Sequence, residues 1–284
     1  MIANARMYAV SPEAAALWRQ LLSAVIARAG LDVELIEHAE PTPIEELWQR
    51  SDMAAVFMCG LPYARAEPRP QLIAAPVPSP AAFLDRPEYW SEWVVRKDSS
   101  AQRIEDAFGG RIALTVGHSQ SGFLAALTDI RGRSRTFPPY RELIAPQITP
   151  QGALRAVLED RADVAPIDAY TLCLLRAFRS DLTDAVRVIG RTAATPIPPL
   201  VASMGGLESL QAAFLEADRM PAVRPLMSAL LLQRFVRPEP AAYDELRARY
   251  AAGLQYWSEH PFAAAVHPEF AELREARAQR PPVR

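Results

Sequence analysis

The stretch Arg111–Thr128, RIALTVGHSQSGFLAALT, constrains this chain most because it combines a strand pattern, a small polar turn and a helix pattern. Ile112–Val116 is a β-branched and apolar run with the length of a buried strand. Gly117–Gly122 is small and polar, and Phe123–Leu127 begins an apolar pattern of helical type. The first N–H groups of such a helix lack backbone partners, and the helix dipole favours negative charge in front of them. The stretch therefore predicts a place where an anion can bind without a lysine or arginine.

The serines of this turn, Ser119 and Ser121, have three possible roles. They can donate hydroxyl hydrogen bonds to an anion, with Gln120 between them and with Gly122 letting the backbone approach a ligand closely. The segment GHSQS is also close to G-x-S-x-G, in which Ser119 would be a nucleophile, although Ser121 replaces the second glycine. Either serine can instead cap the helix, the most common role of serine at this position. The stretch alone leaves all three roles open.

Composition excludes several other classes of protein. The 284 residues, 50% of them hydrophobic and 23% charged, suffice for one large globular domain or for two lobes with separate cores. The net charge of −2 argues against a general surface for nucleic acid or anionic membranes. No apolar run is long enough to span a bilayer, and no Cys/His cluster has metal-ligand spacing. We therefore expect no nucleic-acid partner, no direct membrane insertion, no metal and no cofactor.

Residues 1–60 alternate between strand and helix patterns in the order β-α-β-α-β, which is typical of a parallel sheet. The three strands are expected at Arg6–Val10, Val33–Ile36 and Ala54–Cys59. A helix is expected over Glu13–Ala29, and Thr42 begins a capping box that would open a second helix. The alternation resumes from Tyr89 to Ile189, and the chain after Gly206 is expected to be mostly helical.

Five segments, taken in order, resemble the phosphonate-type substrate-binding proteins of ABC transporters, which are type II periplasmic binding proteins. They are YWSEWVVRKDSS, a short helix ending in GGRIAL, HSQSGFL, LRAVLEDRADVAPID and VRVIGRTAATPIPPLV. The resemblance extends from about Arg6 to Tyr256 and is densest between Tyr89 and Val201.

This resemblance implies an α/β fold with two Rossmann-like lobes joined by two crossing segments, and with the ligand cleft between the lobes. Residues 1–86 and 196–284 would form lobe 1, and residues 87–195 would form lobe 2. The crossing segments would fall near Phe83–Trp90 and Arg191–Pro199.

The resemblance also implies which residues of lobe 2 bind the ligand. Family members bind an oxyanion with a turn of small residues at the helix start that corresponds to Gly117–Gly122 here. That role carries over to Ser119, Gln120 and Ser121, with glutamine where threonine is usual. Asp168 follows the strand Val164–Ile167, at the sheet edge where α/β proteins bind ligands. It would accept a hydrogen bond from the ligand, cap the next helix, or do both.

The resemblance implies further ligand-binding residues, for which the sequence itself gives less direct support. Lobe 1 would contribute the end of the strand AVFMCG and the loop after it, with Met58, Cys59, Gly60 and Tyr63 as candidates. Tyr63 would be either an aromatic wall or a half-buried loop residue. The helix start at Thr42 would point toward the cleft, and Tyr8 is a weaker candidate. Relatives carry a histidine before the helix of LRAVLEDRADV. Here Thr149 stands nearby and supplies a hydroxyl or only a cap.

The expected function is that of a solute-binding component of an ABC-type importer, without catalytic residues. It would bind a small anion (phosphonate, phosphate or a related oxyanion) and present it to a permease in the membrane. The N-terminus MIANARMYAV has no apolar core of signal-peptide length. We therefore expect a periplasmic location if a leader has been removed and a cytoplasmic one otherwise.

Two alternative functions stay open at this point. One is a cytosolic sensor or a biosynthetic enzyme built on the same fold, because a fold does not determine a function. The other is a serine hydrolase with Ser119 as nucleophile, Asp168 as the acid, and His260 or His267 as the base.

Overall fold

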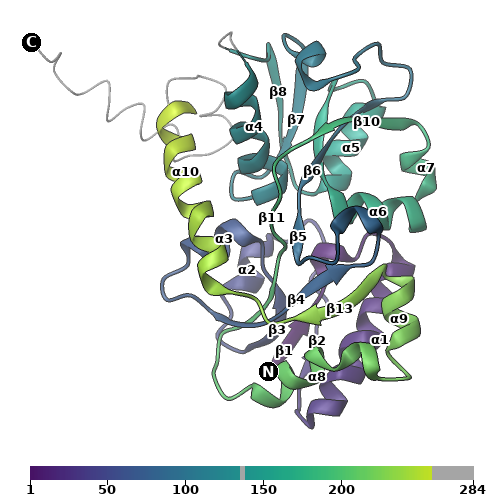
Figure 1. The fold of residues 1–284 in the computed structure, drawn as a ribbon, viewed down its shortest axis with the longest axis vertical. Helices are drawn as coiled ribbons and strands as arrows, with labels where there is room; N and C mark the ends of the chain where they lie inside the picture. Colours follow the sequence, from purple (N-terminus) through teal and green to yellow (C-terminus); the bar gives the residue numbers. More distant parts are fainter. Residues whose placement is uncertain (135–137, 258–284) are drawn as a thin grey trace, which may run out of the picture. The chain divides into compact units, whose positions relative to one another are not determined.

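The computed structural model describes residues 1–134 and 138–257, which form two compact units (Figure 1). Unit 1 comprises Met1–Tyr89, Ala169–Ser180 and Ala194–Asp244. Unit 2 comprises Trp90–Asp168, Asp181–Ala193 and the described residues from Glu245 onward.

The sheet of unit 1 has six strands in the order β13-β4-β12-β3-β1-β2. They are β1 (Ile2–Asn4), β2 (Glu34–Leu35), β3 (Met53–Phe57), β4 (Gln71–Pro78), β12 (Leu200–Ala202) and β13 (Leu232–Val236). Strand β1 pairs in parallel with β2 and β3, which confirms the parallel arrangement predicted for residues 1–60. The other three strands join the sheet through antiparallel pairs.

Two predictions for unit 1 are wrong in detail. The first strand is Ile2–Asn4 rather than Arg6–Val10, because the Asn4 side chain accepts the Arg6 N–H at 2.8 Å and turns the chain into a short 3₁₀ helix. Strand β13 lies in the region expected to be helical. Its pairing with β4 and the ring contact of Phe235 with Phe214, at 5.1 Å, override the local pattern.

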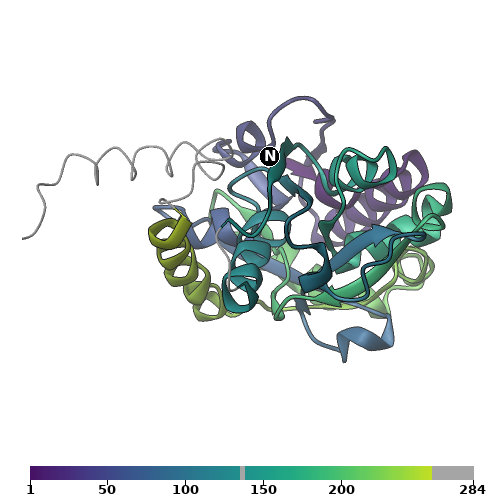
Figure 2. The ribbon, with the colours of Figure 1, turned by 90° about the horizontal axis from the view of Figure 1, so that it is seen from above.

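Helix α1 (Pro12–Ala29) confirms the first predicted helix. The Ser11 hydroxyl caps it by accepting the Ala14 N–H at 3.1 Å, and Gly30 ends it at a φ of 69°. It packs against α8 (Glu208–Leu215) and α9 (Arg224–Ala229), and Figure 2 shows α1, in purple, from above. The short helices α2 (Ile44–Trp48) and α3 (Gly60–Arg65) follow β2 and β3.

The expected crossing segments contain a two-stranded pair. Strand β5 (Glu88–Tyr89) pairs antiparallel with β11 (Thr195–Pro196), and the Ile197 N–H donates to the Pro87 carbonyl at 3.0 Å. Two of the five boundaries between the units, Tyr89/Trp90 and Ala193/Ala194, fall inside the two expected crossing segments.

The strands of unit 2 lie in the order β8-β7-β9-β6-β10. They are β6 (Ser91–Arg96), β7 (Arg111–Thr115), β8 (Glu142–Gln147), β9 (Ala165–Asp168) and β10 (Val186–Arg191). Strands β7 and β8 are parallel, a parallel bridge joins β7 to the residue before β9, and β6 pairs antiparallel with β9 and β10. The helical segments of unit 2 include a 3₁₀ helix (Ile104–Ala107), a π-helix (Gln120–Ala125), α4 (Ala126–Arg133), α5 (Pro150–Leu158) and α7 (Ser180–Thr183).

The units differ from the expected lobes at two helices. Helix α6 (Ala169–Phe178) groups with unit 1, because the Tyr170 hydroxyl donates to the Leu230 carbonyl at 2.7 Å and its ring packs on Tyr8. Helix α10 (Asp244–Trp257) groups with unit 2 after its first residue, and Arg131 donates to its Ala252 carbonyl at 3.3 Å.

Candidate functional site

The strand, turn and helix predicted around residue 117 are present in unit 2. Strand β7 ends at Thr115, and a continuous helical segment follows from Gln120 to Arg133, with its first six residues in π-helical form. The Leu124 N–H donates to the Ser119 carbonyl at 3.0 Å, which is the wide i→i+5 spacing of a π-helix. Such turns are frequent at functional sites.

Ser119 is the N-cap of this helix, which confirms the capping role. Its hydroxyl accepts the Gly122 N–H at 3.1 Å, and its φ of −74° and ψ of 129° are ordinary extended values. A nucleophile elbow instead holds its serine on a sharp, strained turn. Ser119 therefore does not have the elbow conformation, and the candidate bases His260 and His267 lie outside the described residues.

Gly122 has a packing role that the sequence reasoning did not predict, and its close approach to a ligand stays a prediction. A Cβ at Gly122 would lie 2.1 Å from Thr115 Oγ1 and 2.7 Å from its methyl carbon, so the close approach is to β7. Thr115 is 3% exposed, and its hydroxyl has no hydrogen-bond partner within the described part of the chain. The glycine thus lets the helix start pack directly on the end of the strand.

The carbonyl of Ser121 is held by a residue that the sequence reasoning missed. Ser91, the first residue of β6, donates its hydroxyl to this carbonyl at 2.7 Å. Ser91 also lies opposite Asp168 in the β6–β9 ladder. The sequence does contain a signal for this role, because Ser91 is a polar residue at the i, i+2, i+4 spacing that places it on the same strand face as Trp93 and Val95. All three residues are fully buried.

Asp168 is the last residue of β9 and is 4% exposed. Strand β9 lies against the π-helix, so unit 2 brings the carboxylate and the Ser119–Gly122 turn into one neighbourhood, with Ser91 bonded to the turn and paired with Asp168. Thr149 is the N-cap of α5, where its hydroxyl accepts the Gly152 N–H at 3.2 Å. Its capping role is confirmed, and its contact with a ligand stays a prediction.

In unit 1, Tyr8 is part of an aromatic cluster. It is 1% exposed, and its ring centroid lies 4.8 Å from that of Tyr170, 5.1 Å from that of Phe57 and 6.3 Å from that of Trp18. Met58 follows Phe57, is also buried, and donates its N–H to the Pro199 carbonyl at 3.0 Å. Both residues serve packing, and their ligand contacts stay predictions.

Tyr63 lies in helix α3 and is buried, so the expected half-buried loop position is wrong, while its role as an aromatic wall for a ligand stays a prediction. Its ring contacts Tyr243, with centroids 4.9 Å apart, and the Arg69 guanidinium lies 5.6 Å from the ring centroid. Burial raises the pKa of the Tyr63 hydroxyl above its usual value. Arg69 in turn forms an ion pair with Asp244 at 2.6 Å.

The prediction of a capping box at Thr42 is wrong. Helix α2 begins at Ile44, its N-cap is Pro43, and no side chain caps it. The Thr42 N–H donates to the Ala39 carbonyl, and the Thr42 carbonyl accepts from the Arg6 guanidinium. These two bonds fold Thr42 into the preceding turn, so the helix starts one residue later than the pattern predicts.

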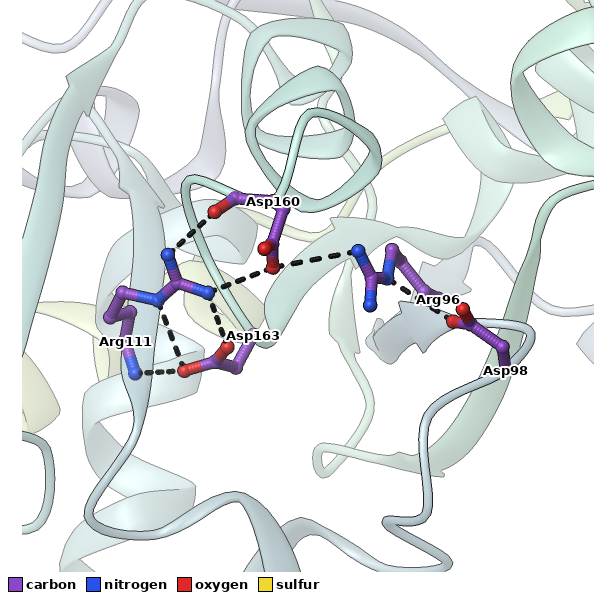
Figure 3. A network of polar contacts seen from close by, with 5 residues as sticks. All are labelled: Arg96, Asp98, Arg111, Asp160 and Asp163. Atoms are coloured by element: carbon purple, nitrogen blue, oxygen red, sulfur yellow. Dashed lines mark hydrogen bonds and ion pairs between the residues drawn. The ribbon is translucent and has the colours of Figure 1, made fainter.

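The opposite end of the same sheet carries a charged network (Figure 3). Asp163 accepts hydrogen bonds from the Arg111 backbone N–H at 2.6 Å and from its Nη2 at 2.7 Å. Asp160 accepts from Arg111 Nη2 at 2.9 Å and lies 3.5 Å from Arg96 Nη1. These contacts hold the pKa of the Asp163 carboxyl below its usual range and raise that of Arg111. The charges at this end therefore neutralise one another.

Comparison with solved structures shows the fold. A binding-protein component of an ABC phosphonate transporter from Pseudomonas aeruginosa has a TM-score of 0.74 at 16% identity, covering 98% of both chains. PhnD1 from Prochlorococcus marinus in complex with methylphosphonate has a TM-score of 0.71 at 13% identity, covering 88% of this chain and 97% of that chain. A Xanthomonas citri protein bound to ATP has a TM-score of 0.62 at 16% identity, covering 92% and 98%. The predicted type II periplasmic binding protein fold is confirmed.

Sequence comparison identifies the family. No curated protein sequence matches this chain. Along the ranges 1–134 and 138–257, no helix is both long and apolar enough to cross a membrane. The family model of ABC transporter phosphonate periplasmic substrate-binding proteins matches residues 8–243. The chain therefore belongs to this family of periplasmic substrate-binding components, whose members bind a small ligand for a transporter rather than catalyse a reaction.

Proposed function

We propose that this protein binds a small phosphonate, phosphate or related oxyanion at the Ser119–Gly122 turn and presents it to a membrane permease. The observation that carries the proposal is the start of the π-helix, where Ser119 caps the helix, the Ser91 hydroxyl binds the Ser121 carbonyl, and Asp168 lies nearby. The first N–H groups of a helix and the dipole behind them favour an anion in front of them.

The proposed binding mode needs no lysine or arginine in the turn. Hydrogen bonds from neutral donors to an ionised oxyanion are short and stronger than neutral pairs, so a few N–H and hydroxyl donors suffice. The Asp168 carboxylate would accept a hydrogen bond from a protonated ligand oxygen, a hydroxyl or an amine. It would repel a fully ionised oxygen placed against it, and so it would select the ligand's protonation state.

The relatives support this class of ligand. The family is defined by phosphonate transport, and PhnD1 with the same fold was solved with methylphosphonate. The Xanthomonas citri structure contains ATP, so phosphate esters are included among the candidate ligands. Export and delivery to a permease follow from the family and are part of the proposal.

A thermal-shift screen tests the proposal. The purified protein would be melted with methylphosphonate, inorganic phosphate, phosphite, sulfonates, phosphate esters and carboxylates. A ligand at a hundredfold excess over its dissociation constant stabilises the folded state by about 2.7 kcal/mol, which raises the melting temperature measurably.

We expect a phosphorus oxyanion to give the largest shift, and the double variant Ser119→Ala/Ser121→Ala to lose it. A folded protein that gives no shift with any oxyanion would contradict the proposal, provided that mass spectrometry finds no ligand retained from purification. Turnover of an activated ester that Ser119→Ala abolishes would instead favour the hydrolase.

A further inference from the structure

Ser91 makes hydrogen bonds in three directions from a fully buried position at the start of β6. Its hydroxyl donates to the Ser121 carbonyl at 2.7 Å. Its backbone N–H donates to Thr192 Oγ1 at 3.0 Å, and its carbonyl accepts the Thr192 N–H, also at 3.0 Å. It is paired with Asp168 in the β6–β9 ladder. Through its side chain and its backbone, Ser91 thus connects the Ser119–Gly122 turn, Thr192 and the strand that ends in Asp168.

The contact with Ser121 fixes a single peptide plane. The carbonyl of Ser121 and the N–H of Gly122 belong to the same planar unit and point in opposite directions when it is trans. Ser91 binds the carbonyl at 2.7 Å, and Ser119 Oγ binds the N–H at 3.1 Å. Both ends of this peptide are therefore held, and its rotation would break one bond or the other.

A third contact holds the same peptide from the side. The space that a Cβ of Gly122 would occupy is filled by Thr115, so the helix start cannot move toward β7. Of the three residues that hold the plane, Thr115 and Ser119 are close to the turn in sequence. Ser91 is separated from Ser121 by 30 residues and ties the turn to a different strand.

We propose that Ser91 is a positioning residue for oxyanion binding at the Ser119–Gly122 turn. It does not touch the ligand in this account. It holds the Ser121–Gly122 peptide so that the neighbouring helix-start donors face the ligand before the ligand arrives. A site held in its binding geometry gives tighter binding because less order must be created on association. The inference rests on the proposed function of the turn.

The chain offers a matched control at Thr192. Thr192→Val removes the acceptor for the Ser91 N–H and leaves the Ser91 hydroxyl on the Ser121 carbonyl. Ser91→Ala removes that hydroxyl and leaves the backbone bonds to Thr192 in place. Ser91→Ala loses one buried hydrogen bond, whereas Thr192→Val loses the bond from the Ser91 N–H and also the bond that Thr192 Oγ1 donates to the Ala193 carbonyl at 3.3 Å. A purely structural effect would therefore be at least as large in Thr192→Val as in Ser91→Ala.

The test measures the dissociation constant by calorimetry, with methylphosphonate or inorganic phosphate, whichever binds the wild type more tightly. We expect a roughly tenfold weaker affinity for Ser91→Ala and less than a twofold change for Thr192→Val, although Thr192→Val should lose at least as much in melting temperature. In the ligand-free protein, hydrogen exchange of the Gly122 amide should be faster in Ser91→Ala alone. If Ser91→Ala does not fold, Ser91→Cys, which keeps a weak donor, should bind with intermediate affinity.

The outcomes separate this inference from the function on which it rests. If the wild type binds neither probe, the proposed function fails. If the wild type binds and Ser91→Ala binds equally well, or if Thr192→Val weakens binding as much, the positioning role of Ser91 is overturned while the proposed function stands.

Discussion

The two ends of the sheet in unit 2 are built from different kinds of side chain. Where β7 begins, Arg111 is paired with Asp160 and Asp163, and every interaction is between full charges or with a backbone group (Figure 3). Where β7 and β9 end, the groups that hold the backbone are the hydroxyls of Ser91 and Ser119. At the Arg111 end, ion pairs join separate segments of the chain. At the other end, neutral hydroxyl groups hold the backbone of the Ser119–Gly122 turn.

The comparison explains how the Ser119–Gly122 turn could bind an anion although the turn itself contains no lysine or arginine. An arginine already paired with two carboxylates, as at Arg111, would have to give up those partners before it could bind a ligand. N–H and hydroxyl donors at a helix start carry no such counter-ion. The comparison predicts that changes at the charged end affect stability alone, whereas changes at the turn also affect ligand binding.

The largest effect is expected at Gly122. Gly122→Ala places a methyl group 2.1 Å from Thr115 Oγ1, and the turn must shift or the strand must move. We expect a loss of about 2–3 kcal/mol in the free energy of unfolding, measured by urea denaturation, together with loss of oxyanion binding.

Gly132 is the matched control because it lies in the same helical segment and a Cβ there meets no atom within 4 Å. Gly132→Ala should be neutral or stabilise by up to about 1 kcal/mol and should bind ligand normally. Equal behaviour of the two variants would show that the turn is not tightly packed on β7.

The next effect is expected at the charged end. Asp163→Asn loses the charge-assisted bonds from Arg111, and we expect a loss of about 1–2 kcal/mol, since the carboxylate is partly exposed. The oxyanion dissociation constant should not change. Asp98→Asn, which removes an exposed pair with Arg96, should cost less than about 0.5 kcal/mol. A weaker ligand affinity in Asp163→Asn would break the division of roles between the two ends.

The stabilisation from Asp163 also has a defined pH dependence. Its folded-state pKa is lowered by Arg111, so the stabilisation is complete above the unfolded-state pKa of about 3.9 and is lost as the pH falls through the folded-state value. The difference in unfolding free energy between the wild type and Asp163→Asn should therefore be constant near neutral pH and shrink below about pH 4. A difference that grows on acidification would contradict this assignment.

A smaller effect on stability than at Gly122 or Asp163 is expected at Ser119. Ser119→Ala removes an N-cap and should cost about 1 kcal/mol, as should Ser11→Ala at the start of α1. The two variants should differ in ligand binding. Only Ser119→Ala is expected to weaken oxyanion affinity, by about 3- to 10-fold, because backbone donors remain in the turn. Equal affinities in both variants would leave Ser119 with a capping role only.

The sequence predicted those parts of the site that depend on local contacts. Ser119 caps a helix through a bond to Gly122, three residues away, so its role could be inferred from the pattern of the turn. Thr42 has an equally good local pattern, yet its carbonyl accepts a hydrogen bond from Arg6, 36 residues away, and helix α2 starts one residue later than predicted. The capping rule is the same in both places, and a distant partner decides the outcome.

Contacts distant in sequence explain the other differences. Ser91 meets Thr192 across 101 residues, and no spacing rule connects them. Tyr8 and Tyr63 pack on Tyr170 and Tyr243, which come from later segments that no local pattern connects to them. The order of strands and helices was predictable, whereas the partners of individual polar and aromatic groups depended on the completed fold.

The central claim, that an oxyanion binds at the Ser119–Gly122 turn, is tested most directly by nuclear magnetic resonance. Backbone amide shifts of ²H,¹⁵N-labelled wild-type protein would be followed while methylphosphonate or inorganic phosphate is added. We predict that the largest shifts occur at the Ser121, Gly122 and Phe123 amides, and that the Arg111 amide, bonded to Asp163, is unaffected. Saturable binding that leaves the turn amides unchanged and moves others would contradict the claim.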